Sequence, residues 1–212
     1  MHRPTVPIEG SHVYGDATHV LAEGLRPATA EEIVGPYFPV RPIVSTTNDL
    51  TVIAGRELRA LGQVVYISGR VTDRRGTPVQ NAELEIWQAN AAGRYPHPAD
   101  ENTAPIDQNF DGHTKIRTDL EGNWRLKTIK PGGYPVTPDW CRPPHIHFDV
   151  RGRASRLVTQ MYFEGEPLNE MDILLQRSWG GKETAIAHYV GSTGLPEPNA
   201  LVAVWNIVLL AG

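Results

Sequence analysis

The sequence predicts an all-β protein, an antiparallel β-sandwich preceded by an irregular N-terminal arm. Three observations support this prediction. Apolar and polar residues alternate over several short segments, as they do in half-buried strands. Turn residues separate these segments, and the 212-residue chain has 20 glycines and 18 prolines, which is high for a helical protein. Stretches with the 3.6-residue period of a helix are few.

The predicted arm comprises residues 1–57, which are polar and rich in proline. Within it, “TAEE” (Thr29–Glu32) has the spacing of a capping box and predicts one helical turn. Gly35 and Pro36 follow in “IVGPYFP” and should end that turn. We expect the arm to lie over the core rather than to form a second domain. Residues 58–212 are predicted to form the β-sandwich domain.

Strand signals become regular from about residue 61. “QVVYISGRVTD” (63–73) is alternating and β-branched, and “RRGTP” supplies the turn after it. “AELEIWQAN” (82–90) carries apolar residues on both faces, so both faces are expected to be partly covered. “HTKIRTDLEGNWRLKTIKPGGYP” (113–135) is predicted to be a hairpin that turns at Asp119–Asn123.

Three more segments complete the set of strands. They are “HIHFDVRG” (145–152), “RLVTQMYFEG” (156–165) and “ALVAVWNIVLL” (200–210). A short helix is expected around Glu170–Gln176. Many short strands at regular spacing are typical of a sandwich.

Composition and charge exclude several classes of function. The net charge of −4 leaves no basic surface for nucleic acid, and no cluster of Lys and Arg indicates a membrane surface. The single cysteine, Cys141, excludes an internal disulfide framework and any site with several thiolates from one chain. No apolar run reaches the roughly 18 residues that span a bilayer. “MHRPTVPIEG” lacks the apolar core of a signal peptide, so we expect a cytoplasmic protein.

Two histidines stand one residue apart in “DWCRPPHIHFDV” (139–150). Strand alternation places His145 and His147 on one face, with Ile146 and Phe148 on the other. Taken alone, the pair fits polar residues at a sheet surface as well as two nitrogen ligands of one metal. Asp149 shares their face, so a site with two histidines and one carboxylate is an open alternative.

Two tyrosines follow strands at glycine-rich loops, Tyr95 in “QANAAGRYPH” and Tyr134 in “TIKPGGYP”. A single tyrosine is usually a packed aromatic. These two, however, stand in order with several other segments: “GRVTDRRGTPVQNAELEIWQANAAGRYPH”, “PIDQNFDG”, “RPPHIHF” and “TQMYFEGEPL”. In these segments, from about Val65 to Leu209, the sequence resembles the intradiol ring-cleaving dioxygenases. These are non-haem Fe(III) enzymes, and the resemblance is closest to the iron-binding β subunits of protocatechuate 3,4-dioxygenases.

The resemblance implies that Tyr95, Tyr134, His145 and His147 hold one Fe(III). Two phenolates are hard, anionic ligands that suit Fe(III), and imidazole also suits iron. A tyrosine has an ordinary pKa near 10, so it binds as phenolate because the metal displaces its proton. The implied reaction cleaves a catechol-type ring between its two hydroxyls with O₂ and gives a cis,cis-muconate-type diacid. No reductant is needed, and no G-x-G-x-x-G follows a strand.

The same resemblance assigns roles to other residues. Tyr134 would be the ligand that the substrate displaces, leaving as a phenol that takes up a substrate proton. Arg142 would stabilise the electron-rich substrate as oxygen attacks. Gln160 would lie on the oxygen-binding side. Cys141 is expected to be an incidental neighbour.

The expected substrate pocket shows where the chain departs from the pattern. “GPYFP” (35–39) resembles an arm segment that lines the pocket, which places Gly35 and Pro36 there, although a plain structural turn is an alternative. The loop from Tyr134 to His145 is shorter than in protocatechuate enzymes, and Val136 replaces an aromatic residue. Recognition of a ring carboxylate is therefore left open.

The expected assembly is a homo-oligomer of a single kind of chain. The arm does not match the β subunits closely and has no room for the helical N-terminal domain of catechol and hydroxyquinol dioxygenases. All four implied ligands lie in one chain, so no partner subunit is needed to bind iron. The rival interpretation is a non-catalytic transthyretin-like or adhesin-type module, which “SGRVTDRRGTPVQNAELEIW” also resembles. The later tyrosines and histidines favour the enzyme.

Overall fold

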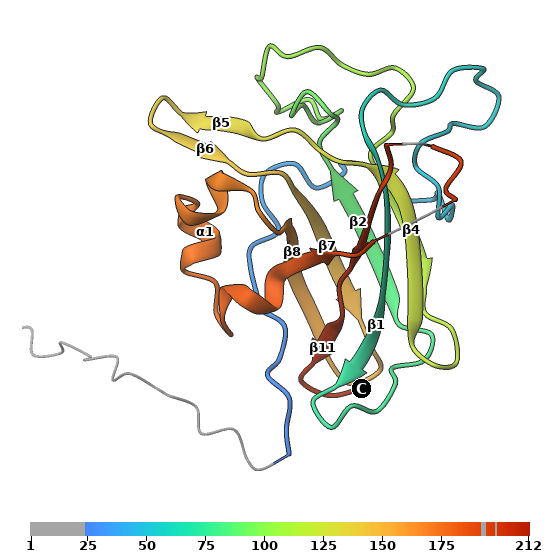
Figure 1. The fold of residues 1–212 in the computed structure, drawn as a ribbon, viewed down its shortest axis with the longest axis vertical. Helices are drawn as coiled ribbons and strands as arrows, with labels where there is room; N and C mark the ends of the chain where they lie inside the picture. Colours follow the sequence, from blue (N-terminus) through green and yellow to red (C-terminus); the bar gives the residue numbers. More distant parts are fainter. Residues whose placement is uncertain (1–23, 192–193, 198) are drawn as a thin grey trace, which may run out of the picture.

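A computed structural model describes residues 24–191, 194–197 and 199–212 of the protein. Nearly all regular structure in this part of the chain is β-structure, which confirms the predicted fold class (Figure 1). The strands are β1 (Val64–Asp73), β2 (Glu83–Gln88), β3 (His113–Arg117), β4 (Asn123–Ile129), β5 (Tyr134–Thr137), β6 (Trp140–Arg142), β7 (His145–Arg151), β8 (Arg156–Phe163), β9 (Ile186–Tyr189), β10 (Leu201–Val204) and β11 (Ile207–Leu209).

The main sheet follows the order β11-β1-β10-β9-β8-β7-β2-β3, with β4 paired to β1, and β5 and β6 form a separate pair. This sheet folds into two layers that enclose the core. Ile67 of β1 and Ile86 of β2 are far apart in the strand order, yet both belong to one buried cluster. Phe148 of β7 packs between the rings of Trp124 and Trp205, at centroid distances of 5.5 and 5.0 Å. Apolar contact between the layers therefore stabilises the fold.

Pairing is antiparallel in most of the sheet, but β1–β10, β1–β11 and β8–β9 are parallel. The predicted hairpin over residues 113–135 is wrong, although its turn is present. Asp119 Oδ1 accepts hydrogen bonds from the backbone N–H groups of Glu121 and Asn123. Beyond the turn, however, β3 pairs with β2 and β4 pairs with β1. A turn of this chemistry serves a connection between layers as well as a hairpin.

The described part of the arm, residues 24–57, runs over the sheet as an irregular strand-like segment. The helical turn predicted at Thr29–Glu32 is wrong. The backbone N–H of Thr29 bonds the carbonyl of Val208, and that of Glu32 bonds Val158, over 3.0 and 2.9 Å. These sheet partners replace the bonds that a capping box would make. Residues 1–23 of the predicted arm lie outside the described residues, and the division at residue 57 stays a prediction.

The helix expected at 170–176 is present as two short pieces. They are the 3₁₀ turn η1 (Pro167–Glu170) and the single turn α1 (Ile173–Gln176), and a second 3₁₀ turn, η2 (Lys182–Ala185), leads into β9. Asp172 caps α1, because its Oδ1 accepts a 2.8 Å hydrogen bond from the N–H of Leu175. Among the described residues, no helix is long and apolar enough to cross a bilayer.

Candidate metal centre

The structure brings the four predicted ligands into one buried cluster. Tyr95, Tyr134, His145 and His147 are between 2 and 6% exposed. Successive rings lie close, with centroid distances of 5.7 Å for Tyr95–Tyr134, 5.5 Å for Tyr134–His145, 5.0 Å for His145–His147 and 6.2 Å for His147–Tyr95. Residues separated by up to 52 positions in the sequence therefore surround a common point.

The two histidines are positioned by the pleat of β7. His145 and His147 point to one face, while Ile146 and Phe148 point into the core. β7 lies between β2 and β8 in the sheet, so its backbone is held on both sides. Trp87 on β2 is directly opposite His147, and the two rings stack at 4.8 Å with an interplanar angle of 12°.

The two tyrosines are brought together by a close approach of their loops. A Cβ atom at Gly93 would lie 2.3 Å from the carbonyl oxygen of Gly133, so a side chain there would force the loops apart. Gly93 also has φ of +77°, which favours glycine. Tyr95 is anchored by its backbone N–H, which donates a 2.7 Å hydrogen bond to Oδ2 of Asp100. Tyr134 begins β5 directly after Gly133.

Several polar atoms of the cluster lack ordinary hydrogen-bond partners. Nδ1 of His145 is 2.7 Å from the carbonyl oxygen of Pro143, which assigns the ring proton to Nδ1 and leaves the Nε2 lone pair free. That Nε2 lies 3.4 Å from Oη of Tyr134. Tyr95 Oη and His147 Nδ1 are buried without a hydrogen-bond partner. Buried polar atoms normally have a hydrogen-bond partner or bind a metal, so the cluster is expected to bind a further group.

Burial sets the protonation of the four rings. It lowers the pKa of His145 well below its usual range and that of His147 to about 3, and the positive charge of Arg142 acts in the same direction. Burial also raises the pKa of Tyr95 well above its usual value, and that of Tyr134 as well. Both imidazoles are thus neutral donors, and a bound cation would be needed to ionise the phenols. This donor set of two phenols and two imidazoles fits a ferric ion.

The alternative site with two histidines and one carboxylate is not formed. Oδ1 and Oδ2 of Asp149 accept hydrogen bonds from Arg156 at 2.9 and 2.7 Å, and Oδ2 accepts another from Arg151 at 2.7 Å. The carboxylate is therefore occupied by two guanidinium groups. Among the described residues, no group of three or more His, Cys, Asp or Glu side chains is arranged to hold a metal.

Arg142 and Gln160 lie together beside the cluster. Arg142 ends β6, opposite Tyr134 in the β5–β6 pair, and is 4% exposed. Its Nη2 donates a 2.8 Å hydrogen bond to Oε1 of Gln160 and a 2.7 Å hydrogen bond to Oη of Tyr162. Its Nε donates to Oδ2 of Asp172 over 2.6 Å, in a buried ion pair. The guanidinium is therefore held in one orientation.

Of the predicted pocket residues, Gly35 lies directly against the cluster. A Cβ atom there would be 3.2 Å from Cε1 of His147. Pro36 follows on the exposed side of the same turn, and the ring of Tyr37 packs against that of Tyr95 with centroids 4.7 Å apart. Val136 lies two residues beyond Tyr134 on β5 and is 48% exposed.

Comparison with known proteins gives the family. A family model described as “Dioxygenase” matches residues 33–211, which is most of the chain. The chain belongs to the intradiol dioxygenases. It is 46% identical over 181 residues to the protocatechuate 3,4-dioxygenase beta chain of Burkholderia cepacia, covering 82% of this chain and 76% of that one. It is 30% identical over 193 residues to hydroxyquinol 1,2-dioxygenase of Corynebacterium glutamicum, covering 84% of this chain but only 59% of the relative.

Solved structures show the same fold for this intradiol dioxygenase. 3-Chlorocatechol 1,2-dioxygenase of Rhodococcus opacus 1CP superposes with a TM-score of 0.69 at 23% identity, over 86% of this chain and 73% of that chain. The dioxygenase domain of a carbohydrate-binding fusion from Streptomyces sp. SirexAA-E gives a TM-score of 0.64 at 24% identity, over 87% and 99% of the chains.

Sequence reasoning missed several residues that touch the centre of this dioxygenase. Trp87 stacks on His147, Tyr162 and Asp172 bond Arg142, and Glu32 reaches Arg142 through Tyr162. Alternation could have found Tyr162, since it shares a strand face with Gln160. The contacts of Glu32 and Asp172 depend on tertiary structure, and no local pattern marks them.

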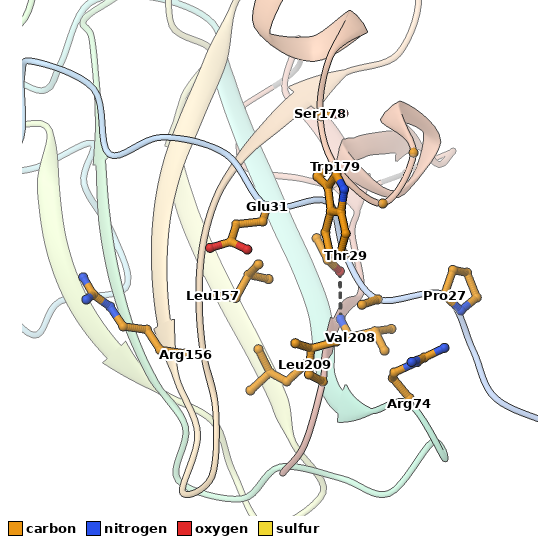
Figure 2. A pocket seen from close by; sticks show the side chains of 14 residues that line it. Pro27, Thr29, Glu31, Arg74, Arg156, Leu157, Ser178, Trp179, Val208 and Leu209 are labelled. Atoms are coloured by element: carbon orange, nitrogen blue, oxygen red, sulfur yellow. Dashed lines mark hydrogen bonds between the residues drawn. The ribbon is translucent and has the colours of Figure 1, made fainter. Parts of the chain in front are cut away.

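Two cavities lie near the arm of the dioxygenase. One, of about 440 Å³, is lined by Tyr37, Trp87, Tyr95 and His97, so it adjoins the cluster. The other, of about 500 Å³, lies between residues 27–31, the loop 178–181 and the end of β11 (Figure 2). None of the four predicted ligands lines this second cavity.

Proposed function

We propose that the protein is a non-haem Fe(III) dioxygenase that cleaves a catechol-type ring between its two hydroxyls with O₂, giving a cis,cis-muconate-type diacid. The observation that carries this proposal is the buried cluster of two tyrosines and two histidines with unpartnered Tyr95 Oη and His147 Nδ1. Tyr95, Tyr134, His145 and His147 would hold the iron. When bound, Fe(III) would act as a Lewis acid toward the catechol oxygens.

Tyr134 is proposed to receive a substrate proton on its Oη. Burial raises the pKa of Tyr134, so the side chain favours the neutral phenol whenever it is released from a cation. The residue also stands at the start of β5, in a two-stranded pair that is separate from the main sheet. Tyr95, His145 and His147 would remain in place, since Tyr95 is anchored through Asp100 and the histidines through β7.

Arg142 is proposed to stabilise negative charge that develops on the ring. Its guanidinium is buried and fixed by Asp172 and Gln160, so the charge is preorganised where little water can screen it. Gln160 is proposed to lie on the oxygen side of the reaction, because it shares hydrogen bonds with Arg142 across the strand face that carries the cluster.

Gly35 and Pro36 of the arm, together with Val136 on β5, are proposed to border the substrate. Gly35 leaves room beside His147, and the adjoining cavity of about 440 Å³ offers space for a ring substituent. The names of the relatives specify protocatechuate and hydroxyquinol. We therefore propose protocatechuate or another substituted catechol as the substrate. A cytoplasmic homo-oligomer is also proposed; because one chain carries all four proposed ligands, a second kind of subunit is not needed to bind iron.

The test is a substrate panel with the purified, iron-loaded protein. Catechol, protocatechuate, hydroxyquinol and larger substituted catechols are supplied in turn, oxygen uptake is recorded, and each product is identified by mass. We expect one muconate-type diacid and one O₂ consumed per ring. We also expect a red to burgundy protein, from phenolate-to-Fe(III) charge transfer. A colourless protein with full iron occupancy, or no uptake with any catechol, would favour the non-catalytic module instead.

A further inference from the structure

Glu32 connects the arm to the residues that hold Arg142. Its Oε2 accepts a 2.9 Å hydrogen bond from Oη of Tyr162, and the same Oη accepts a 2.7 Å hydrogen bond from Nη2 of Arg142. The backbone N–H of Glu32 bonds Val158 on β8, so the residue is fixed at both ends. Its other oxygen, Oε1, is buried without a hydrogen-bond partner.

The hydroxyl of Tyr162 has one proton and two acceptors within reach. Oε2 of Glu32 is at 2.9 Å and Oε1 of Gln160 at 3.3 Å. Burial raises the pKa of Tyr162 far above its usual value, so this proton stays on the phenol. When Glu32 is ionised, the Tyr162 proton points to its carboxylate. When Glu32 is protonated, Glu32 can donate to Tyr162 and the Tyr162 proton can turn to Gln160.

The charge of this group of residues depends on Glu32. The ionisable groups that act on it are Tyr162 on β8, Arg142 on β6 and Asp172 at the start of α1. Arg142 and Asp172 already form an ion pair. An ionised Glu32 therefore makes the group net negative, while a neutral Glu32 leaves the charges balanced. Burial raises the pKa of Glu32 to about 7, although the Tyr162 hydrogen bond and Arg142 act against the rise.

We propose that Glu32 is a positioning residue that controls, through Tyr162, how much of the positive charge of Arg142 is available to the substrate. With a neutral Glu32 carboxyl, Arg142 faces the reacting ring opposed only by Asp172. With an ionised carboxyl, a second anion lies next to the Tyr162 phenol that bonds Arg142. This anion opposes the negative charge that develops on the substrate ring. This inference rests on the proposed ring cleavage and on the role of Arg142 in it.

The same contact ties the arm to the metal centre. Gln160 Nε2 donates a 3.2 Å hydrogen bond to the carbonyl of Ile33, one residue after Glu32. Two residues further on, Gly35 packs against His147. The position of the arm is therefore set at Tyr162 and Gln160, both of which also bond Arg142.

The test compares Glu32→Gln, Glu32→Ala and the control Glu31→Gln. Gln keeps an oxygen that accepts from Tyr162 but cannot ionise, whereas Ala removes the acceptor. Glu31→Gln removes the same charge one residue away, from a side chain that lines the separate cavity (Figure 2). Iron content is equalised, and kcat and KM for the best catechol of the panel are measured between about pH 6 and about pH 8.

In the wild-type protein and in Glu31→Gln, we expect kcat to fall several-fold over this range, up to about tenfold, as a group with a pKa of about 7 ionises. KM should change less, because the charge of Arg142 acts on the reacting ring. Glu32→Gln should show a flat profile at the high level, and Glu32→Ala a flat profile at a lower level. A Glu32→Gln profile that follows the wild type would overturn the inference while ring cleavage stands.

Thermal unfolding supplies a readout that does not depend on turnover. The folded protein keeps a proton on Glu32 that the unfolded chain releases, so the wild-type Tm should decline relative to that of Glu32→Gln as the pH rises from about 5 to about 7. Glu31→Gln should parallel the wild type. Parallel curves of Tm against pH for wild type and Glu32→Gln would contradict a raised pKa of Glu32 in the folded protein. Absence of turnover with every catechol would refute the proposed function, and the role of Glu32 with it.

Discussion

Oδ2 of Asp172 accepts a 2.6 Å hydrogen bond from Nε of Arg142, and the two side chains are 0 and 5% exposed. Oδ1 of the same carboxylate caps α1 through the N–H of Leu175. One acidic side chain therefore fixes the proposed catalytic arginine and starts the only α-helical turn among the described residues. Folding of the 167–176 segment and orientation of Arg142 are thereby linked.

Replacing Asp172 by alanine should destabilise the fold strongly. The change leaves the buried Arg142 guanidinium without its counter-ion, which typically costs about 3–5 kcal/mol, and removes a helix cap worth about 1 kcal/mol. Urea unfolding followed by circular dichroism measures the loss. The control is Glu170→Ala, whose exposed carboxylate pairs with Lys182 and should contribute less than about 1 kcal/mol. Similar losses of unfolding free energy in both variants would show that the buried Arg142–Asp172 pair does not stabilise the fold.

Gly35→Ala should disturb the candidate metal centre, and Gly55→Ala provides a matched control. Both glycines have positive φ, +77° and +83°, so alanine costs about 1–2 kcal/mol of backbone strain at either position. Only at Gly35 does the new Cβ meet another group, Cε1 of His147 at 3.2 Å, whereas nothing lies within 4 Å at Gly55.

We expect both glycine variants to lose similar stability in urea, while Gly35→Ala alone loses kcat/KM. A loss of about tenfold is expected, because misplacement of a catalytic group by about 1 Å can cost about 10²-fold. Equal activity in the two variants would mean that the arm does not border the reacting groups.

The sequence predicted the elements whose partners are local. Alternation along a strand placed His145 and His147 on one face of β7, and the structure has them there. The same rule left Asp149 as a third candidate, and only the tertiary structure shows that Arg151 and Arg156 occupy it. Tyr95 and Tyr134 came from resemblance, because no local pattern distinguishes a ligand tyrosine from a packed one.

Long-range partners were beyond prediction. The turn at 119–123 was identified from its Asp and Gly residues, but these do not say whether the following strand returns beside β3 or crosses to the other layer. The helical turn predicted from the capping box at Thr29–Glu32 was wrong for a related reason. The backbone N–H groups of Thr29 and Glu32 bond strands that are more than 120 residues away in the sequence. Glu32 could not be connected with Arg142 without these distant contacts.

Asp149→Asn should retain iron and colour, since the carboxylate binds arginines and not the cluster. It should also cost stability of about 1 kcal/mol at neutral pH, at the low end for charged hydrogen bonds because both arginines are about half exposed. Burial alone would raise the pKa of Asp149, but hydrogen bonds from Arg156 and Arg151 outweigh it and lower the pKa.

Because the folded pKa of Asp149 is depressed, its contribution to stability is complete above the unfolded value near 4 and is lost as the pH falls. The difference in Tm between wild type and Asp149→Asn should therefore be largest at neutral pH and shrink in acid. Loss of iron on this substitution would revive the site with two histidines and one carboxylate.

Tyr134→Phe, Tyr95→Phe and His147→Ala should separate the displaced ligand from the permanent ones. Tyr134→Phe keeps three ligands and the local packing, so it should retain most of the iron. His147→Ala removes a ligand and also the ring that stacks on Trp87, so it should lose most of the iron. Tyr95→Phe should fall between them, because it removes a proposed permanent ligand but keeps the ring and the backbone bond to Asp100.

Turnover provides the second measurement for these variants. If Oη of Tyr134 takes up the substrate proton, its removal should lower kcat by about 10²–10⁴-fold at equal iron content, which is the usual range for a positioned acid or base. With substrate bound, Tyr95→Phe should change the visible absorption of the iron protein more than Tyr134→Phe does, since Tyr95 is then expected to be the one tyrosine that binds as phenolate. Iron assay, visible spectra and oxygen uptake on the same samples give all three quantities. Equal iron loss in Tyr134→Phe and His147→Ala would contradict the displaced-ligand role, because a ligand that leaves in every turnover cannot be essential for keeping the metal.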